Sequence, residues 1–459
     1  MNIDAAAVIL AAGEGRRLKS TYVKAMHKIS GVPIVTHVKR AAVAAGASRC
    51  IVVVGRDADL VRRTLGRDCE YVLQTERLGT GHACRQAEES LRDFSGVVMV
   101  LMGDAPLITS DTLARMLSEH LRLGAKATVL TASPQDVHGL GRIQRDTAGR
   151  FSRIIEERDA NAEEKKIREI NAGFYCFERA ALFDALARID NVNAQGEYML
   201  TDTLPLIAEE GLVHTVELPD FSEAVGVNDR VWLSKAEEAM QQRIKERLMR
   251  DGVTIVDPAS TYIEADVTVG ADTVIMPFTC LRGETRIGGH CTIGPGSTLE
   301  NTSVAAHSVV VHSYLVGAAV GEACQVGPFA HLRPETSLSE GVRVGNFVEI
   351  KKSQIGAGSK VSHLSYIGDA TLGRDVNIGA GTIFVNYDGV NKHETVIEDE
   401  AFIGCNSNLV APLTIGKGAF VAAGSTITRD VPEEALGVAR ARQENKEGWV
   451  RRKRPKTEN

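Results

Sequence analysis

Three kinds of signal that would identify a protein class are missing from this sequence. No apolar segment approaches the roughly 20 residues that a membrane-spanning helix needs, and the apolar run Ala5–Ala12 follows the acidic Asp4 and is far shorter. The eight cysteines form no Cys-x-x-Cys pair, and a chain of 459 residues needs no disulfide framework. We therefore expect a soluble protein of the reducing cytoplasm, with a buried strand at Ala5–Ala12.

An excess of charge of one sign is also missing. The net charge is -6, from 53 basic and 59 acidic residues, which gives no reason to expect nucleic-acid binding. The basic run Arg451–Arg454 lies near the end of the chain, where we interpret it as a solvated tail. We expect neither nucleic acid nor a membrane as a partner.

The sequence does have an aliphatic residue at every sixth position over much of residues 263–427. The spacing is kept from Val326 to Ile350, from Ile355 to Ile367 and from Ile397 to Ile427, often with glycine following. The longest uninterrupted run of this six-residue spacing is Ile263, Val269, Ile275, Leu281, Ile287, Ile293 and Leu299.

A period of six fits neither the 3.6-residue repeat of an amphipathic helix nor the alternation of a half-buried strand. It is typical of a parallel β-helix, in which short strands stack and each coil buries its aliphatic row on the next. Three hexapeptides make one triangular coil, so this stretch provides roughly nine or ten coils. A β-sandwich with Gly-rich turns is the alternative, but it would not keep one register for so long. The pattern resembles the left-handed β-helix of hexapeptide acyltransferases.

Residues 4 to about 228 show a different pattern, in which short apolar runs alternate with helical segments. The runs include Ala7–Leu10, Cys50–Val54, Tyr71–Leu73 and Val97–Leu101. Such alternation favours a doubly wound, mainly parallel α/β sheet, whose ligands bind at the carboxyl ends of the strands.

Two of these strand ends carry residues suited to phosphate chemistry. Residues Leu10–Leu18 contain two glycines, whose backbone amides can approach an anion, and two arginines. The segment matches neither a dinucleotide fingerprint nor a Walker A loop. After the run Val97–Leu101, Asp104 offers a carboxylate suited to Mg²⁺, although an aspartate that caps the next turn is an equal alternative.

Together the two segments resemble the sugar-1-phosphate nucleotidyltransferases. That family opens with Leu-Ala-Ala-Gly-x-Gly-x-Arg and a later lysine, which places Arg17 and Lys24. Gln74 and Leu78–Ala83 match the segment that contacts nucleobase and sugar in the branch that makes UDP-N-acetylglucosamine. The resemblance implies a UDP-N-acetylglucosamine site formed by Leu10, Ala11, Ala12, Gly13, Lys24, Gln74, Gly79, Thr80, Met102, Gly103, Asp104, Gly141, Glu156, Asn171 and Asn228.

The resemblance also implies the chemistry of this site. Asp104 and Asn228 would hold Mg²⁺, which with Arg17 and Lys24 would offset the repulsion between the sugar phosphate and UTP. Positioning and electrostatics can carry the step, so no covalent intermediate is expected. Two departures from the family stand beside these residues, because Val23 replaces a proline and Met102 a common tyrosine.

The length of the chain allows two or three domains. Residues from Asp229 to about Arg250 are predicted to form one helix, with Gly252 just past its end. We therefore expect a nucleotidyltransferase domain at residues 1–228, a linker helix at 229–252, a β-helix at 253–432 and a C-terminal arm at 433–459.

Charged and aromatic residues interrupt the hexapeptide pattern in its later coils. Arg333 and Lys351 are 18 residues apart, and Glu349 and Tyr366 are 17 apart, so each pair is separated by about one coil. With His363 they are predicted to lie at nearby positions of one face. A break in the register between Ile378 and Ile397 also predicts an exposed loop, and long loops that leave a solenoid are usually functional.

This cluster completes a resemblance to the bacterial family of bifunctional UDP-N-acetylglucosamine pyrophosphorylases/glucosamine-1-phosphate N-acetyltransferases, over nearly the whole chain. It implies amino-sugar-phosphate contacts from Arg333, Lys351, Tyr366 and Asn377. Asn386 and Tyr387 are implied to contact either this sugar phosphate or acetyl-CoA. Acetyl-CoA contacts are implied for Ala380, Cys405, Ala423 and Arg440, with Cys405 where the family commonly has serine.

His363 is the expected catalytic base of the acetyl site. An ammonium cannot attack a thioester, and a neutral imidazole can take the proton of the amine near physiological pH. Glu349 would orient His363 or fix the substrate amine. Cys405 either donates a weak hydrogen bond to acetyl-CoA or only packs as a small residue.

The sequence thus predicts a bifunctional enzyme that makes a cell-wall precursor. The C-terminal half would acetylate glucosamine-1-phosphate with acetyl-CoA, and the N-terminal half would join the product to UMP from UTP. The resemblance implies a homotrimer, since β-helices of this kind usually form trimers. Two alternatives stay open: a nucleotidyltransferase whose β-helix serves only assembly or regulation, and a non-catalytic scaffold or nucleic-acid-binding protein.

Overall fold

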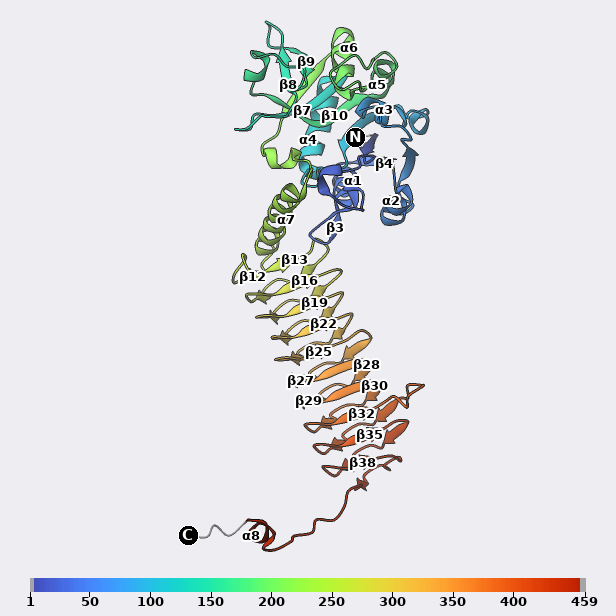
Figure 1. Ribbon diagram of the computed structural model, residues 1–459, viewed down its shortest axis with the longest axis vertical. Coiled ribbons are helices and arrows are strands. Elements are labelled where there is room, and N and C mark those ends of the chain that lie inside the picture. The colour runs from blue at the N-terminus through green and yellow to red at the C-terminus, as the bar shows by residue number, and fades with distance from the viewer. Residues whose placement is uncertain (1–3, 455–459) are drawn as a thin grey trace. The chain divides into compact units, whose positions relative to one another are not determined.

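The computed structural model describes residues 4–454, which form two compact units that divide between Arg243 and Ile244 (Figure 1). The first unit is built on a nine-stranded sheet with the order β11-β7-β10-β6-β1-β4-β5, in which β8 pairs with β10 and β9 pairs with β8. These strands are β1 (Ala5–Leu10), β4 (Ala47–Val54), β5 (Glu70–Leu73), β6 (Val97–Met102), β7 (Ala127–Ala132), β8 (Arg142–Arg145), β9 (Phe151–Ile155), β10 (Ile170–Glu178) and β11 (Val213–Glu217).

The central strands pair in parallel, and β10 runs antiparallel to both of its neighbours β6 and β7. Residues alternate between the two faces of β1, so that Ala7 and Ile9 belong to one hydrophobic cluster and Ala6 and Val8 to another. All four are fully buried. The mainly parallel α/β sheet with a buried strand inside Ala5–Ala12 is therefore confirmed.

Helices cover both faces of this sheet (Figure 1). Residues of α1 (Ile34–Ala44), α2 (Ala58–Leu65) and α4 (Ser110–Leu123) pack in the first cluster. Residues of α3 (Thr80–Arg85), α5 (Arg179–Leu186) and α6 (Thr203–Glu210) pack in the second. A small hairpin, β2 (Lys28–Ile29) and β3 (Val32–Pro33), precedes α1.

The order of the strands creates a switch point beside β1. The chain runs from β1 to β4 and β5 on one side and then crosses to β6 on the other, where Leu10 and Met102 are register partners at the strand ends. Ligands of doubly wound sheets bind outside the carboxyl ends of the strands at such a point.

The helix α7 (Arg230–Arg250) occupies the segment for which one helix was predicted. Within the first unit, its residue Ala236 packs in a third cluster with Leu18, Ile34 and Leu107. Because Leu18 and Leu107 follow β1 and β6, this cluster supports the two segments that border the switch point.

The second unit is a left-handed parallel β-helix of short strands, stacked as Figure 1 shows. One ladder has 11 strands. They are β12 (Thr254–Ile255), β15 (Val274–Ile275), β18 (Thr292–Ile293), β21 (Val309–Val310), β24 (Gln325–Val326), β27 (Arg343–Asn346), β29 (Lys360–His363), β31 (Asn377–Ile378), β34 (Phe402–Ile403), β37 (Phe420–Val421) and β39 (Leu436–Gly437).

The remaining strands form a path of 17 that makes up the rest of each coil. They are β13 (Tyr262–Ile263), β14 (Thr268–Val269), β16 (Cys280–Arg282), β17 (Arg286–Ile287), β19 (Thr298–Glu300), β20 (Ser303–Val304), β22 (Tyr314–Val316), β23 (Ala319–Val320), β25 (His331–Leu332), β26 (Thr336–Leu338), β28 (Glu349–Ile355), β30 (Tyr366–Leu372), β32 (Ile383–Val385), β33 (Thr395–Ile397), β35 (Asn408–Val410), β36 (Leu413–Ile415) and β38 (Thr426–Ile427).

The aliphatic rows are the core of the β-helix. One row stacks without a gap and is fully buried at Ile263, Leu281, Leu299, Leu315, Leu332, Ile350 and Ile367. Each such side chain contributes about 2 kcal/mol of hydrophobic stabilisation. The predicted β-helix is therefore confirmed, and the β-sandwich alternative is wrong.

A loop leaves the β-helix between β32 and β33, where an exposed loop was predicted. It is closed by an antiparallel bridge between Tyr387 and Lys392. After β39 comes α8 (Trp449–Lys453), where the basic residues Arg451, Arg452 and Lys453 are exposed. No helix within residues 4–454 is long and apolar enough to cross a membrane.

Two candidate active sites

A cavity of about 290 Å³ opens at the switch point of the first unit. It is bordered by the ends of β1 and β6 and by the start of α3. Its predicted lining residues are Leu10, Ala11, Ala12, Gly13, Lys24, Gln74, Gly79, Thr80, Met102, Gly103 and Asp104. Most of the expected nucleotide-sugar site is thus brought together in one place.

Two glycines allow the backbone segments around this cavity to approach each other closely. A Cβ atom on Gly103 would lie 2.7 Å from the carbonyl oxygen of Leu10, to which the Gly103 amide donates over 3.0 Å. At Gly79, where φ is +114°, a Cβ atom would lie 2.8 Å from the backbone nitrogen of Tyr198. A side chain at either position would push the walls of the cavity apart.

Lys24 places a positive charge between two oxygen ligands. Its ammonium contacts the Asp104 carboxylate and donates to Oδ1 of Asn228 over 2.7 Å. The preceding Val23 is buried and has a φ of −62°, which is the value that a proline ring would impose. Val23 therefore has a backbone φ that a proline at this position could also adopt.

The pair Asp104 and Asn228 fits a hard cation such as Mg²⁺. Both side chains offer oxygen atoms, and both already face one cationic group, the Lys24 ammonium. Within residues 4–454 no cluster of three or more His, Cys, Asp or Glu side chains is arranged to hold a metal. Two protein oxygens are nevertheless sufficient for Mg²⁺, which usually takes its other ligands from phosphates and water.

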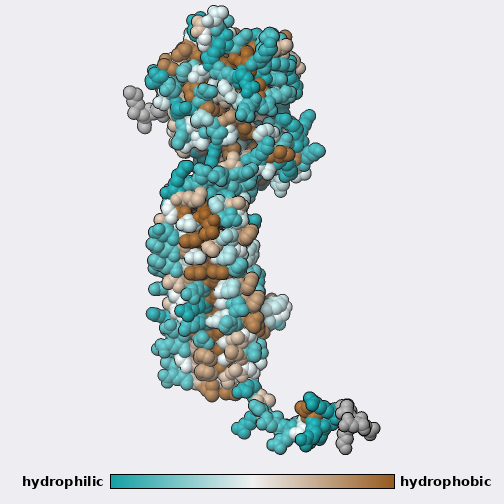
Figure 2. All heavy atoms as spheres, turned by 90° about the vertical axis from the view of Figure 1, so that its left-hand side faces the viewer, coloured by the Kyte–Doolittle hydropathy of each residue, from teal (hydrophilic) through white to brown (hydrophobic). Residues whose placement is uncertain are grey.

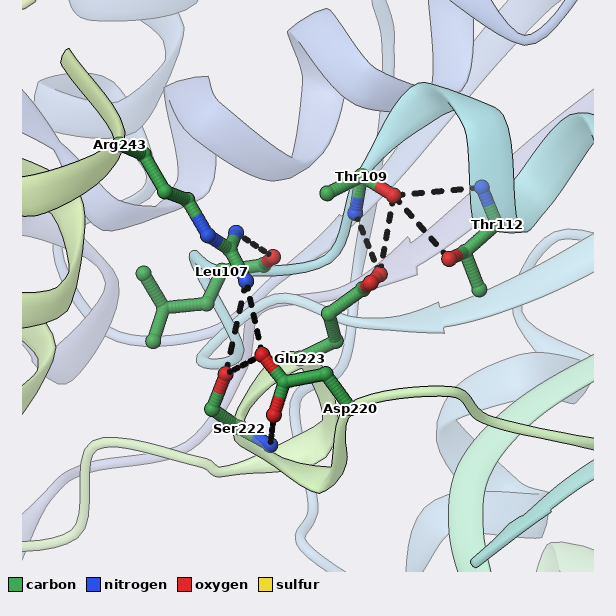
Figure 3. Close-up of polar contacts among 7 residues, drawn as sticks. All are labelled: Leu107, Thr109, Thr112, Asp220, Ser222, Glu223 and Arg243. Atoms are coloured by element: carbon green, nitrogen blue, oxygen red, sulfur yellow. Dashed lines mark hydrogen bonds and ion pairs between the residues drawn. The ribbon is translucent and has the colours of Figure 1, made fainter. Parts of the chain in front are cut away.

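A buried polar network braces the loops that carry these two residues (Figure 3). Glu223, only 5% exposed, accepts hydrogen bonds of 3.0 Å from both the amide and the hydroxyl of Thr109. Arg243 of α7 donates to the carbonyl of Leu107 in the same loop. The amide of Val227 donates to the carbonyl of Asp104 over 2.9 Å. The network thus ties the loop after β6 to the segment that ends at Asn228.

Gly141, Glu156 and Asn171 do not line the cavity but lie together beside it. The Asn171 amide donates to the Gly141 carbonyl over 2.9 Å, and a Cβ atom on Gly141 would lie 3.5 Å from the Glu156 carboxylate. Burial raises the pKa of Glu156, although its carboxylate accepts from the hydroxyl of Thr201 over 3.3 Å. The Glu156 side chain therefore resists ionisation more than an exposed glutamate does.

Arg17 was predicted to act on the phosphates, and the structure places it elsewhere. It is exposed on the 3-10 turn η1 (Arg16–Leu18) and is absent from the lining of the cavity. The lining cation that the prediction missed is Arg77, which forms an ion pair of 2.5 Å with Glu14. Hydrogen bonds from Arg16 and Arg77 lower the pKa of Glu14 to about 2.

The acetyl site of the second unit contains a hydrogen-bonded pair that the prediction also missed. Nδ1 of His363 on β29 lies 2.7 Å from Oδ1 of Asn346 on β27, and the two residues are register partners. Because an amide oxygen only accepts, Nδ1 carries a proton, and in the neutral ring Nε2 then keeps its lone pair. Asn346 was not assigned from the sequence, although its 17-residue distance from His363 was a usable signal.

The expectation that the acetyl-site residues share one face holds for Arg333, Glu349, Lys351 and Tyr366, which lie on or directly after the stacked strands β25, β28 and β30, but it is wrong for His363. His363 belongs to the 11-stranded ladder, whereas Lys351 and Tyr366 belong to the 17-stranded path. The chain turns between them at Leu364, which has a φ of +49°, so a corner of the triangular coil separates the two groups. Asn377 likewise pairs with Lys360 in the 11-stranded ladder and does not stack with Tyr366.

Glu349 contacts Arg333 instead of the expected base. Oε1 of Glu349 accepts from the Arg333 guanidinium over 2.8 Å, and Glu349 is the register partner of Tyr366. The nearby Lys351 has a lowered pKa, because it faces a second ammonium, that of Lys392, and is partly desolvated. Two ammonium groups held together favour the binding of an anion such as a phosphate.

The exposed loop carries Asn386 and Tyr387, and side chains hold both in place. Asn386 donates to the buried carboxylate of Asp369 over 2.6 Å, and the Tyr387 hydroxyl donates to the carbonyl of Gly389 over 2.6 Å. At the base of the loop, the hydrogen bond from His393 lowers the pKa of Asp388 to about 2.

The residues expected at acetyl-CoA lie near one another on successive coils. The Asn406 amide donates to the Ala380 carbonyl over 2.7 Å, and the Gly424 amide, next to Ala423, donates to the Cys405 carbonyl over 2.8 Å. Cys405 is exposed, so its thiol is not packed in the core. A Cβ atom on Gly424 would lie 3.7 Å from Cδ of Arg440, which places Arg440 at the same corner.

Comparisons with known proteins match both units. A family model described as a MobA-like NTP transferase domain matches residues 7–201, and one described as a bacterial transferase hexapeptide (six repeats) matches residues 266–301 and 394–429. A relative from an Exiguobacterium species, named bifunctional protein GlmU, is 54% identical over 449 residues and covers 97% of this chain and 99% of its own. Relatives of the same name from Geobacillus thermodenitrificans and Bacillus velezensis are 51% and 50% identical over 451 and 446 residues, covering 98% and 97% of this chain and 98% of their own.

The fold and the two sites define a bifunctional transferase, with a nucleotidyltransferase unit followed by a hexapeptide β-helix. At this identity and coverage, the chain belongs to the family of bifunctional GlmU proteins. The two activities expected from the sequence, uridylyl transfer and acetyl transfer, are confirmed, and the single-activity and non-catalytic alternatives are set aside.

Proposed function

We propose that the β-helix acetylates glucosamine-1-phosphate and that the α/β unit then converts the product and UTP into UDP-N-acetylglucosamine and pyrophosphate. The observation that supports this assignment best is that Lys24 and Asp104 line the switch-point cavity and that Asn228 contacts the same Lys24 ammonium. A pair of cation-binding oxygens beside the Lys24 ammonium is suited to a substrate that carries several phosphates.

In the acetyl site, His363 acts as the general base. Its Nε2 takes a proton from the amine of the amino sugar, while Asn346 holds the Nδ1–H tautomer. The amine nitrogen forms a bond to the thioester carbon, the carbon–sulfur bond breaks, and the proton passes to the CoA thiolate. Lys351 and Arg333 would bind the phosphate of the substrate.

In the nucleotidyl site, the chain binds and orients two anions. An oxygen of the sugar phosphate forms a bond to the α-phosphorus of UTP, and the bond from that phosphorus to the β-phosphate bridge breaks to release pyrophosphate. Lys24 offsets the charge that develops on the phosphate oxygens. We retain Arg17 as a proposed contributor, with Arg77 as the cation that already lines the cavity.

Mg²⁺ is the proposed cofactor of the nucleotidyl site, with Asp104 and Asn228 as its protein ligands. When bound, it would neutralise phosphate charge and favour the departure of pyrophosphate. Lys24, which contacts both ligands, would then be released toward the phosphates.

A homotrimer is proposed for the β-helix. Figure 2 shows apolar side chains gathered along the length of the β-helix on the face in view. Phe278, Phe329, Phe347 and Leu364 are all more than half exposed, and the rings of Phe329 and Phe347 stack at 5.5 Å. An exposed apolar column of this kind marks an interaction surface. Moreover, Asn377 and Tyr366 lie on different faces of one chain, so a neighbouring copy would complete a substrate site that needs both.

A cytoplasmic location is proposed because all eight cysteines are free in the described structure, which suits a reducing compartment. The domain boundaries at residues 228, 252 and 432 also stay proposals.

Two assays on one preparation test the proposed function. CoA should be released from acetyl-CoA only when glucosamine-1-phosphate is present, and pyrophosphate from UTP only with N-acetylglucosamine-1-phosphate and Mg²⁺. His363→Ala should abolish the first reaction and spare the second, and Asp104→Ala should do the reverse. Loss of both reactions in either variant would contradict the division into two independent sites.

A further inference from the structure

His82 lies behind the wall of the nucleotide cavity. Its Nδ1 is 3.1 Å from Nε2 of Gln74, a side chain that is 7% exposed and lines that cavity. His82 itself lines a separate cavity of about 590 Å³ on the other side. The imidazole therefore contacts the side chain that faces the ligand, but it does not line the ligand's cavity.

A second contact fixes which atom of the Gln74 carboxamide faces His82. The same Gln74 atom lies 3.2 Å from the backbone carbonyl of Gly79, and a carbonyl only accepts, so this atom is the amide nitrogen. Nδ1 of His82 must then accept, which requires a neutral imidazole with its proton on Nε2. Within residues 4–454, Oε1 of Gln74 has no hydrogen-bond donor, so it is available to a ligand.

Gln86 competes for the acceptor nitrogen of the same ring. Its Nε2 lies 3.3 Å from Nε2 of His82 and donates to the His82 backbone carbonyl over 3.0 Å, so it is an amide nitrogen as well. A neutral imidazole has one acceptor nitrogen and serves one of the two glutamines. The shorter contact belongs to Gln74.

We propose that His82 is a positioning residue that selects uracil over cytosine by holding the Gln74 carboxamide in one orientation. Uracil presents an N–H donor at N3, and cytosine presents an acceptor nitrogen there. A fixed Oε1 accepts from uracil and meets an unfavourable acceptor in cytosine. Sites that hydrogen-bond a substrate donor reject an analogue that lacks it. The inference rests on the proposed function, which places the nucleobase against Gln74.

Turning the carboxamide would bring Oε1 against the Gly79 carbonyl, and it would also require His82 to move its proton from Nε2 to Nδ1. Without His82 only Gly79 opposes it, and the amide nitrogen can then face N3 of cytosine more often. Loss of His82 should therefore relax the selection without abolishing it, by about tenfold for one hydrogen bond.

The test is the ratio of kcat/KM for UTP to that for CTP, with N-acetylglucosamine-1-phosphate as the second substrate. His82→Phe should lower this ratio about tenfold. His82→Asn should keep it near the wild-type value, because Oδ1 of asparagine can take the place of Nδ1 as acceptor. Gln86→Leu is the matched control on the other side of the ring and should also keep it. The ratio cancels the fraction of folded enzyme, so a merely structural role for His82 would leave it unchanged.

An unchanged ratio in His82→Phe, or failure of His82→Asn to keep it, would overturn the inference. His82→Ala replaces the phenylalanine variant if that protein does not fold. Gln74→Leu distinguishes the role of His82 from the placement of the nucleobase against Gln74. If Gln74→Leu lowers the ratio and His82→Phe does not, only the role of His82 is wrong. If Gln74→Leu also leaves the ratio unchanged, the placement of the nucleobase against Gln74 is wrong.

Discussion

Oδ1 of Asn346 lies 2.7 Å from Nδ1 of His363, and these residues occupy equivalent positions in adjacent coils of the β-helix. The rigid stack of coils thus sets the ring orientation and the tautomer together. A base that must receive a proton at Nε2 needs both, because a rotated ring or the other tautomer presents a donor to the amine.

Replacement of Asn346 by alanine is therefore expected to lower kcat for acetyl transfer at least about tenfold, since general-base catalysis depends on this geometry. Uridylyl transfer should not change, because Asn346 belongs to the other unit. Asn408→Ala is a suitable control, as Asn408 donates to Thr426 over 3.2 Å on another ladder of the β-helix. Equal acetyl-transfer rates in the Asn346 variant and the control would show that His363 needs no such orientation.

Substitutions of Asp104 and Asn228, the proposed ligands of Mg²⁺, are expected to impair uridylyl transfer. Asp104→Asn removes the charged ligand, so uridylyl transfer should fall at least about a hundredfold. Asn228→Ala should raise the Mg²⁺ concentration for half-maximal rate, with acetyl transfer unaffected in both variants. Asp111→Asn changes an exposed carboxylate in the first turn of α4 and should have no effect. A wild-type Mg²⁺ titration in the Asn228 variant would remove that residue from the proposed site.

Glu223 is expected to support the same site from a distance. Glu223→Ala leaves the amide and hydroxyl of Thr109 without their acceptor, which should cost about 2 kcal/mol of folding free energy and loosen the loop that carries Asp104. Calorimetry should show a lower unfolding temperature for the first unit, and kcat for uridylyl transfer should fall several-fold. Glu209→Ala, which removes an exposed carboxylate, is the control variant. If the Glu223 variant matched that control in both measurements, the network of Figure 3 would have no part in holding the site.

The β-helix could be predicted from the sequence because one physical constraint repeats. Each coil must bury an aliphatic residue against the next, as Leu281 does on Leu299. The gap in the six-residue count after Leu299 is not a gap in the fold. Leu315 stacks directly on Leu299 after only 16 residues, because the steps from Leu299 to Val304 and from Val310 to Leu315 are five residues long instead of six.

At the acetyl site the spacing failed only for His363, because spacing does not show where the chain turns a corner. A spacing of 17 or 18 residues indicates that two side chains are one coil apart. It does not show that the chain turns a corner at Leu364, between His363 and Tyr366. In the nucleotidyl unit, the loop motif located the cavity correctly because the strand ends define it. The motif did not reveal that Arg17 is exposed and that Arg77 reaches the cavity, since both depend on how the loops pack.

Glu156 allows a prediction in which stability and activity change in opposite directions. Burial raises its pKa above the unfolded-state value of 4.5, so the folded protein resists the charged form. Below about pH 4, the carboxyl is protonated in both the folded and the unfolded state, and no penalty arises. As the pH rises from 4.5 toward the higher folded-state pKa, stability is lost, because the unfolded chain has released the proton that the folded chain still holds. Glu156→Gln cannot lose stability in this way.

The Glu156→Gln variant should therefore unfold at a temperature roughly 2 °C higher than the wild type at about pH 7, and the difference should vanish near pH 4. Its uridylyl transfer should decrease, because a carboxylate beside Gly141 and Asn171 accepts hydrogen bonds from sugar hydroxyls more strongly than an amide does. Glu209→Gln, at an exposed position, should change neither quantity. An equal gain in stability at both pH values would mean that the substitution acts through packing, because only the ionised carboxylate is destabilised by burial.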